Sequence, residues 1–359
     1  MALCSQMLRE LVHFVDWLLF IAHFVHEKKV ERSHANNLAC ARMLLGIFDV
    51  LDGLNRMKIG VVIPSYRVTR HILDVIAGIG PEVSKIYVVD DACPDESGKF
   101  VKAKCKDKRV TVLTHEINQG VGGAVLTGYA KALEDGIDIA VKIDGDGQMD
   151  PKLLPAIIAP IVSGRADYSK GNRFDTLESL EQMPRIRIFG NAVLSLMSKI
   201  STGYWNITDP TNGYTAIHRS ILSQLPMAKV NKRFFFESDM LYRLAVMRAV
   251  VWDVPIASSY GDEISNLKIG KVLWEFPRRH FANHLKRIFY AYYLRELNIA
   301  SFELPLGLLM MVFGTVTGLV RYGQSLAGAD AASAGTVMLS AVPLILGFQL
   351  FLAFISYDI

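Results

Sequence analysis

Three carboxylates and an amide follow directly after an apolar run in the middle of the chain. The run IDIAVKI, residues 137–143, is typical of a buried strand, and Asp144, Asp146, Gln148 and Asp150 come next. Carboxylates this close repel one another unless a positive charge lies between them. Carboxylate and amide oxygens suit Mg²⁺ or Mn²⁺, and this set leaves coordination positions for phosphate oxygens. We therefore predict that Asp144, Asp146 and Gln148 hold a divalent metal that carries a nucleotide diphosphate.

An EF-hand calcium loop and a plain acidic turn are the alternatives for this segment. The EF-hand pattern requires glycine and glutamate where this chain has Met149 and Pro155, so it is excluded. An acidic turn that merely ends a strand is the usual explanation of an isolated Asp-x-Asp pair. The preceding buried strand, Gln148 and the Asp150–Pro151 pair favour the metal site here.

The composition indicates a membrane part and gives no sign of nucleic-acid binding. The 359 residues are enough for about two domains. Hydrophobic residues make up 51% and the mean hydropathy is +0.26, which is high for a soluble enzyme. The net charge of +4 is too small for a nucleic-acid footprint. None of the four cysteines lies in a Cys-x-x-Cys pair, which argues against a zinc site and predicts reduced thiols facing the cytosol.

Strand and helix patterns alternate from Met57 onward. Strands are expected at 58–66, 83–95, 109–115 and 137–147, and helices at 72–79 and 122–136. This alternation predicts an α/β fold with a mostly parallel sheet and helices on both faces. In such sheets ligands bind outside the carboxyl ends of the strands, where Pro64–Arg67, Asp90–Asp91 and Asp144–Asp150 are expected.

The glycine-rich segment NQGVGGAVLTG, residues 118–128, matches neither common phosphate-binding fingerprint. It has no Lys-Ser/Thr pair for a Walker A loop, and Val125 stands where GxGxxG requires its third glycine. A dinucleotide-dependent dehydrogenase is thereby excluded. We expect these glycines to let a helix pack close to the sheet and the nucleotide.

Residues 1–56 form an extension with an apolar stretch, Leu11–Val25. Its 15 residues are too few to span a bilayer. Glu10 precedes the stretch and no small-residue cleavage site follows, so it is a poor signal peptide. The alternatives are an interfacial or packed amphipathic helix, and an upstream extension of a chain whose natural start is Met57.

The C-terminal part has the pattern of a membrane anchor. Residues 304–320 and 334–355 contain no charge and would span roughly 26 and 33 Å as helices. They predict two transmembrane helices, with a buried soluble hairpin as the alternative. Residues 268–298 carry seven Lys/Arg against two acids, interleaved with aromatic residues, which predicts a basic amphipathic helix on an anionic membrane surface. By the positive-inside rule this side faces the cytoplasm, and the hairpin returns the C-terminus to it.

Five segments in order carry a resemblance to a known family. IPSYR, VVDDACPD, NQGVGGA, KIDGDGQMDP and GNRF together resemble the family-2 glycosyltransferases with the GT-A fold. More narrowly they resemble the polyprenyl-phosphate glycosyltransferases, of which dolichyl-phosphate mannose synthase is the type. The resemblance covers Lys58 to about Lys271. It implies a GT-A catalytic domain, which we expect at 57–265. The charge and hydropathy patterns described above place the membrane-surface segment at 266–302 and the two transmembrane helices at 303–359.

The resemblance also implies roles for individual residues. The nucleotide of the donor is expected against Pro64, Tyr66, Arg67, Asp90, Asp91, Gly120 and Asp144. The acceptor phosphate is expected against Arg173, Arg187, Asn191 and Lys268, although the family often has serine at the position of Asn191. Near the sugar and the acceptor, the segments DPTNGYTA and FFFESDML supply the candidate catalytic residues Asp209, Glu237 and Asp239, with Gly213 beside them.

Plain structural roles are the alternative for four of these residues. Arg187 could be a solvated charge on a helix. Asp209 could cap the turn that Asp-Pro initiates. Glu237 could stabilise a helix start, and Asp91 could be a turn-forming acid before Pro94.

The function that these residues predict is an inverting, metal-dependent transfer of a sugar to a polyprenyl phosphate. The donor is a UDP- or GDP-sugar, and the enzyme is expected at the cytoplasmic membrane with two spans, its catalytic domain in the cytoplasm. An ionised phosphate needs no strong general base, whereas a sugar hydroxyl would.

The alternatives are a transferase with a saccharide or lipid hydroxyl acceptor and a non-catalytic membrane scaffold. A processive synthase is disfavoured because no Gln-x-x-Arg-Trp motif is present. Assembly of a homo-oligomer through the membrane helices is left open.

Overall fold

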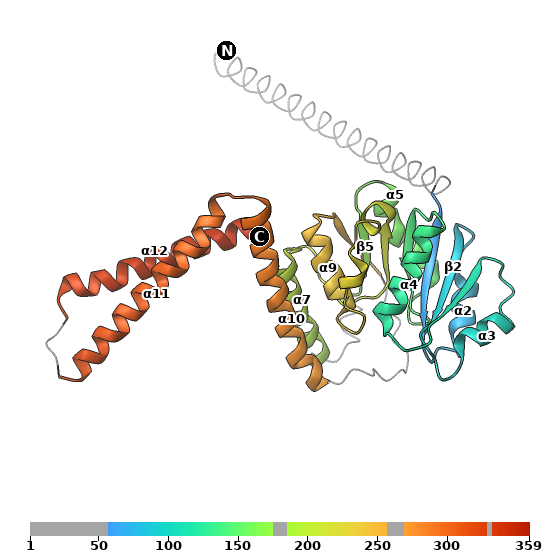
Figure 1. The fold of residues 1–359 in the computed structure, drawn as a ribbon, viewed down its shortest axis with the longest axis horizontal. Helices are drawn as coiled ribbons and strands as arrows, with labels where there is room; N and C mark the ends of the chain where they lie inside the picture. The colour runs from blue at the N-terminus through green and yellow to red at the C-terminus, as the bar shows by residue number, and fades with distance from the viewer. Residues whose placement is uncertain (1–56, 175–184, 257–268, 329–331) are drawn as a thin grey trace, which may run out of the picture. The chain divides into compact units, whose positions relative to one another are not determined.

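The structure is a computed structural model that describes residues 57–174, 185–256, 269–328 and 332–359, and its strands form a seven-stranded sheet (Figure 1). The strands are β1 (Ile59–Ser65), β2 (Val83–Asp90), β3 (Val110–Thr114), β4 (Ile139–Lys142), β5 (Tyr168–Asn172), β6 (Thr215–His218) and β7 (Val251–Pro255). Their order is β3-β2-β1-β4-β6-β5-β7. Strand β6 pairs antiparallel with β4 and β5, and the other pairs are parallel. The expectation of a mostly parallel sheet is confirmed.

Helices and short 3₁₀ turns connect the strands of this sheet. They are α2 (Ile72–Gly78), α3 (Ser97–Lys104), α4 (Val121–Glu134), α5 (Leu154–Val162), α7 (Arg185–Thr202), α8 (Arg219–Leu222) and α9 (Phe236–Val246), with 3₁₀ turns η1 (Pro151–Leu153) and η2 (Met227–Lys229). Helix α4 lies against β1 and β2. A Cβ on Gly128 would come within 2.3 Å of Val62 Cγ1, so this glycine permits the close approach predicted for the glycine-rich segment.

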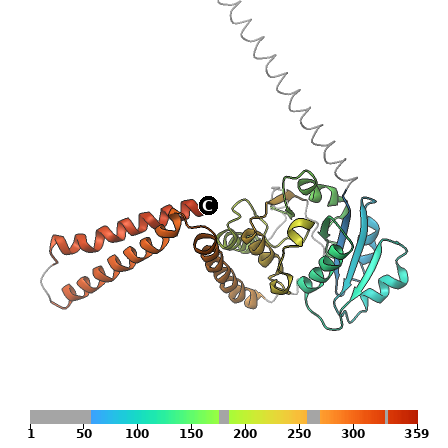
Figure 2. The ribbon, with the colours of Figure 1, turned by 45° about the horizontal axis from the view of Figure 1, so that its top comes forward.

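Helix α10 (Ile269–Phe289) follows the part that contains the sheet and lies along α7, as both Figure 1 and Figure 2 show. It continues into a π-helical turn, η3 (Tyr290–Arg295), and the chain leaves the helical conformation at Glu296. The basic helix expected over 268–298 is therefore present, but a π turn and an extended residue separate it from the next helix.

Two long apolar helices end the chain, α11 (Ile299–Leu326) and α12 (Ala334–Asp358). They run side by side in Figure 2, and their apolar residues are mostly exposed. A Cβ on Gly314 would lie 2.6 Å from the Ser340 carbonyl oxygen, and one on Gly347 would lie 2.7 Å from the Gly307 oxygen. Small residues that let two backbones approach this closely are typical of membrane helix pairs. Both helices are long and apolar enough to cross a membrane, as the sequence predicts.

A buried ion pair joins the end of α12 to α10. Both terminal nitrogens of Arg287 donate to the Asp358 carboxylate at 2.7 Å, and the Tyr292 hydroxyl donates to it at 2.8 Å. The Asn298 amide donates to the Tyr357 hydroxyl at 3.2 Å. The last turn of α12 therefore lies beside the first turn of α11, so the two ends of the hairpin are on the same side.

His280 of α10 lies at the contact of this helix with α7 and with the start of α9. Its ring is 4% exposed and makes edge contacts with Phe235 and Phe276, each within 6.5 Å between ring centres. Its Nδ1 is 2.8 Å from the Ser201 hydroxyl of α7. Burial lowers the pKa of His280 to about 4, because the charged imidazolium would lose its hydration there.

The buried neutral His280 predicts a loss of stability in mild acid. His280 binds a proton near pH 6.5 in the unfolded chain and near pH 4 in the folded chain. The stability that the neutral ring contributes is therefore complete above pH 6.5 and lost as pH falls toward 4. The loss at pH 4 is about 3 kcal/mol of unfolding free energy. Thermal unfolding of detergent-solubilised protein at a series of pH values measures it.

The control for this prediction is His280→Asn, which keeps a polar partner for Ser201 and does not titrate. We expect the variant to be less stable than the wild type at pH 7.5 and the difference to shrink toward pH 4. A difference that stays constant over this range would contradict the prediction.

Candidate active site

The carboxyl ends of β1, β2, β4 and β5 meet at one edge of the sheet. Because β6 runs in the opposite direction, the edge also receives the segment that precedes β6, Asp209–Tyr214. Lys142, the last residue of β4, pairs in register with Thr215, the first residue of β6. The reversed strand thus brings the DPTNGYTA segment beside the Asp144 loop, which the predicted strands alone did not indicate.

Asp90 and Asp91 organise the loops around the predicted nucleotide pocket. Asp90 accepts hydrogen bonds from the backbone N–H of Cys93 at 2.8 Å and of Gly98, near the start of α3, at 2.6 Å. The Asp91 carboxylate accepts from the backbone N–H of Gln119 at 2.8 Å and of Gly120 at 2.7 Å. Both carboxylates are buried, so the structure shows them holding loops in place. Side-chain contact with a nucleotide stays a prediction.

His115 is a member of this pocket that sequence reasoning missed. Its Nδ1 lies 2.7 Å from Asp91 Oδ1 and its Nε2 lies 2.9 Å from the Thr127 hydroxyl of α4. This chain of contacts ties the end of β3 to Asp91. The only sequence signal was its place as the last residue of a predicted strand.

The other predicted nucleotide residues lie at the exit of β1 and at the start of α4. Pro64 lies in β1, and Tyr66, just beyond the strand, is 45% exposed. Arg67 has a left-handed backbone, φ 59°, and its guanidinium lies over the Tyr66 ring at 5.5 Å. Gly120 has φ 91°, and a Cβ there would lie 2.5 Å from the Lys232 carbonyl oxygen, so other residues would be strained and crowded at this position.

The buried lysine Lys142 accompanies the predicted metal ligand Asp144. Its Nζ lies 2.8 Å from Asp144 Oδ1 and 3.3 Å from Glu237 Oε1, and it donates to the Gly213 carbonyl at 3.2 Å. A Cβ on Gly213 would lie 2.4 Å from that Nζ and 2.6 Å from Asp144 Oδ2. The family-derived residues Gly213 and Glu237 therefore meet Asp144 in space. Lys142 was overlooked, although a charge inside an apolar strand was a visible signal.

The remaining metal candidates lie in a turn open to solvent. Asp146 accepts the backbone N–H of Gln148 at 3.0 Å, and Gly147 has φ 79°, which turns the loop back. Among the residues that the structure describes, no three His, Cys, Asp or Glu side chains group as a metal site by themselves. The predicted donors are two carboxylates and an amide, so the residues fit a hard cation whose other ligands come from a diphosphate.

Arg173 is held by a fully buried carboxylate. Its Nε donates to Asp209 Oδ2 at 2.8 Å and its Nη2 donates to Oδ1 at 3.1 Å. The buried Lys170 donates to the Asp209 backbone carbonyl. Burial alone would raise the pKa of Asp209, but Arg173 and Lys170 outweigh it and hold that pKa below its usual value. Asp209 is thus an ionised anchor for Arg173.

The two acids at the start of α9 have different partners. Glu237 faces Lys142, and burial raises its pKa despite that lysine. Asp239 instead accepts the backbone N–H of Asn231 at 2.8 Å and the Nε of Arg243 at 3.0 Å. The structure therefore brings Glu237, and not Asp239, to the Asp144 cluster.

Two of the predicted acceptor residues lie at or beyond the limits of the described chain, and a third, Asn191, lies within it. Asn191 lies in the first half of α7 and is partly exposed. The side chain of Arg187 and the whole of Lys268 lie outside the described residues, as does the extension at 1–56.

Two helices present apolar side chains to solvent beside this site. Helix α7 exposes Phe189, Val193, Leu196 and Ile200, and α10 exposes Trp274, Phe281, Leu285 and Phe289. The spacings of four, three and four residues on α7 place its set on one face. The amphipathic pattern of α7 was present in the sequence but was overlooked. Adjacent helices with exposed apolar faces are suited to lie on a membrane surface.

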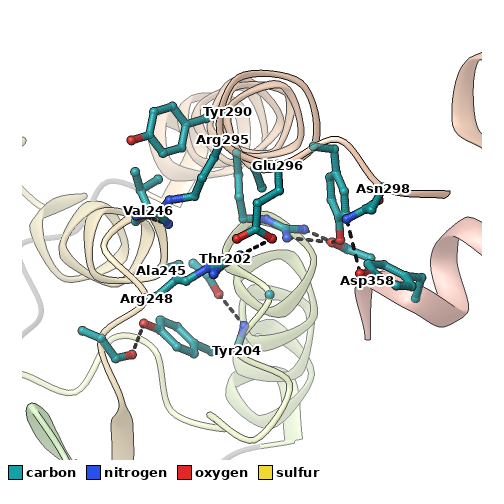
Figure 3. A pocket seen from close by; sticks show the side chains of 16 residues that line it. Thr202, Tyr204, Ala245, Val246, Arg248, Tyr290, Arg295, Glu296, Asn298 and Asp358 are labelled. Carbon is teal, nitrogen blue, oxygen red and sulfur yellow. Dashed lines mark hydrogen bonds and ion pairs between the residues drawn. The ribbon is translucent and has the colours of Figure 1, made fainter. Parts of the chain in front are cut away.

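A cavity of about 320 Å³ lies at the other end of α7 and α9, where η3 and the ends of the hairpin meet them (Figure 3). Four of its charged side chains form two ion pairs, Arg248 with Glu296 at 2.8 Å and Arg287 with Asp358 at 2.7 Å, and Arg295 donates to the Val246 carbonyl at 2.9 Å. Glu237 lies in the first turn of α9 and the cavity touches the last turn of that helix, so the cavity is separate from the strand-end site. The cavity lies where the ends of α7 and α9 meet the ends of the apolar hairpin.

Known proteins are similar to this chain over the part that carries the site. Residues 61–225 match Glycosyl transferase family 2. The chain is 31% identical over 214 residues to a UDP-N-acetylglucosamine–dolichyl-phosphate N-acetylglucosaminyltransferase of Methanococcus voltae, covering 56% of this chain and 85% of that protein. It is 31% identical over 205 residues to an undecaprenyl-phosphate mannosyltransferase of Micrococcus luteus, covering 56% and 83%.

A solved structure supports the fold. Glucosyl-3-phosphoglycerate synthase of Mycobacterium tuberculosis, crystallised with Mn²⁺, UDP and phosphoglyceric acid, superimposes with a TM-score of 0.50 at 19% identity. The match covers 66% of this chain and 81% of that one. The sheet, the strand-end site and these similarities together confirm the predicted family: the chain belongs to glycosyl transferase family 2 and is a glycosyltransferase with the GT-A fold.

Proposed function

We propose that this enzyme transfers a sugar from a UDP- or GDP-sugar to a membrane polyprenyl phosphate with inversion at the anomeric carbon. The relatives named above, one dolichyl-phosphate and one undecaprenyl-phosphate transferase, support this acceptor class. The polyprenyl-phosphate sugar formed would serve assembly of a cell-envelope glycan or glycoconjugate.

The observation that carries the proposal is that each candidate catalytic acid is already paired with a cation. Asp209 is bound to Arg173, Glu237 to Lys142 and Asp239 to Arg243. A sugar hydroxyl acceptor would need one of them to remove its proton. A phosphate is already ionised at neutral pH, so its oxygen can attack without a base. The pairing therefore favours a phosphate acceptor.

The chain's own residues then bind and orient the two substrates. A divalent cation at Asp144, Asp146 and Gln148 would neutralise charge on the departing diphosphate. Arg173, fixed by Asp209, presents its guanidinium to the acceptor phosphate, a pairing that suits arginine. As the new bond from the phosphate oxygen to the anomeric carbon forms, the bond to the diphosphate breaks on the opposite face. Much of the rate would come from this positioning.

We place the catalytic domain at 57–265, a membrane-surface segment at 266–302 and two spans at 303–359. The exposed apolar faces of α7 and α10 support binding of these helices to the bilayer surface, where the lipid acceptor is concentrated. The basic residues of α10 favour the cytoplasmic side of the membrane. The Arg287–Asp358 pair keeps both ends of the hairpin on that side.

The first test is a partition assay with purified protein, undecaprenyl phosphate, Mg²⁺ or Mn²⁺, and labelled UDP- and GDP-sugars supplied one at a time. We expect label in the organic phase with one donor, and none with Asp146→Ala. Intact metal-dependent nucleotide binding without lipid-borne label from any donor would contradict the polyprenyl acceptor and favour a saccharide acceptor.

Removing the charge of Arg173 should weaken use of the acceptor. We expect Arg173→Gln to lower kcat/KM for the polyprenyl phosphate roughly 10- to 100-fold, because a charge-assisted hydrogen bond contributes about 1.5–3 kcal/mol. Steady-state kinetics with varied lipid concentration measure this change. Nucleotide affinity should stay within about twofold, because Arg173 is assigned to the acceptor phosphate and the hydrogen bond lost is not to the nucleotide.

A control separates acceptor binding from loss of structure, since Arg173→Gln leaves the buried Asp209 unpaired. The double variant Arg173→Gln/Asp209→Asn removes both charges and should regain stability but not acceptor use. Recovery of normal acceptor kinetics in the double variant would argue against a role for Arg173 at the phosphate.

Adding a methyl group at Gly213 should disturb the donor site. The new Cβ would lie 2.4 Å from Lys142 Nζ and 2.6 Å from Asp144 Oδ2, so one of them must move. We expect Gly213→Ala to weaken metal-dependent nucleotide binding about tenfold, consistent with overpacking costs of about 1–3 kcal/mol. The matched control is Gly190→Ala in α7, where the Cβ meets nothing within 4 Å. Equal affinities in the two variants would refute the expectation.

A further inference from the structure

A lysine inside the sheet shares its charge between two carboxylates of the active site. Lys142 is 1% exposed, and its Nζ contacts Asp144 Oδ1 at 2.8 Å and Glu237 Oε1 at 3.3 Å. The third polar neighbour is the Gly213 carbonyl oxygen at 3.2 Å. These partners come from β4, from the segment before β6 and from the first turn of α9.

Electrostatics explains why this lysine stays charged. Burial alone would lower the pKa of Lys142, but the two carboxylates outweigh burial and raise it above its usual value. A buried ammonium is tolerated only when it is paired and its protons are bonded. Two acids around one lysine leave the group with one net negative charge.

Asp144 can interact with two different cations. It is the partner of Lys142 and, in the proposed function, a ligand of the donor's divalent cation. An ammonium at 2.8 Å from Oδ1 repels a dication that approaches the same carboxylate. Glu237 offers the lysine a second partner only slightly farther away, so Nζ can move toward Glu237 as a cation engages Asp144.

We propose that Lys142 and Glu237 set the metal affinity of the donor site without being metal ligands. Lys142 competes with the cation for Asp144, and Glu237 offsets this competition by drawing the lysine charge to itself. Both are positioning residues that act through Asp144. The inference rests on the proposed metal site, and it adds a role for the buried lysine and a non-catalytic role for Glu237.

Opposite changes in metal affinity in two variants test the inference. The measurement is Mn²⁺ binding to the full-length protein with saturating UDP or, separately, GDP, followed by the electron paramagnetic resonance signal of free Mn²⁺. We expect Lys142→Met to bind Mn²⁺ about tenfold more tightly, because the competing charge is gone. We expect Glu237→Gln to bind it about tenfold more weakly, because the lysine then pairs with Asp144 alone.

A purely structural role for Lys142 would weaken binding in both variants, and changes of the same sign would overturn the inference. If Lys142→Met does not fold, Lys142→Met/Glu237→Gln keeps the charge balanced and should bind Mn²⁺ more tightly than Glu237→Gln alone. Equal affinities of the double and single variants would also overturn it. Wild-type protein that binds neither nucleotide in a Mn²⁺-dependent manner would instead overturn the proposed metal site, and this inference with it.

Discussion

The need to neutralise carboxylates gathered at one edge of the sheet governs the rest of this structure. Asp144, Glu237 and Asp209 are brought together where strands end, and two cations accompany them. The buried Lys142 lies beside the first two, and the partly exposed Arg173 pairs with the third. Unpaired charges at such depth would destabilise the fold. The same cations limit what the acids can do, since an acid held by a lysine or an arginine is a poor proton acceptor.

The reversed strand β6 is what makes this cluster possible. In a fully parallel sheet, the segment before a strand lies at the edge opposite to the catalytic one. Because β6 is antiparallel to β4 and β5, Asp209–Gly213 arrives at the catalytic edge instead. One short segment then serves two purposes: Asp209 fixes Arg173, and Gly213 leaves room for Lys142 beside Asp144.

Exposed apolar faces lie on α7, which also carries the predicted acceptor residue Asn191, and on α10. Helix α7 carries Asn191 near its start and a row of exposed apolar residues along its length, and α10 packs beside it with a similar row. The buried Arg287–Asp358 pair holds the apolar hairpin at the far end of the same helices. In the proposed function, a lipid acceptor that enters along these faces would reach Asn191 on α7 without leaving the membrane surface.

The sequence by itself determined the features that depend on local pattern. Apolar runs predicted the strands β1, β2, β3 and β4 within a few residues, and uncharged stretches predicted α11 and α12. The acidic loop after β4 was recognisable because its residue types and spacing are adjacent in the chain. The ordered motifs then identified the family, which the similar proteins confirmed.

Only the tertiary structure decided which charges meet. Lys142 and Glu237 are 95 residues apart, and Arg173 and Asp209 are 36 apart. Such pairs are set by strand order and by the direction of β6, which no local pattern records. For the same reason Glu237 and Asp239, two positions apart in one segment, looked equivalent in the sequence. The helical turn at the start of α9 directs Glu237 to Lys142 beside Asp144 and Asp239 to Arg243, because neighbouring side chains on a helix point in different directions.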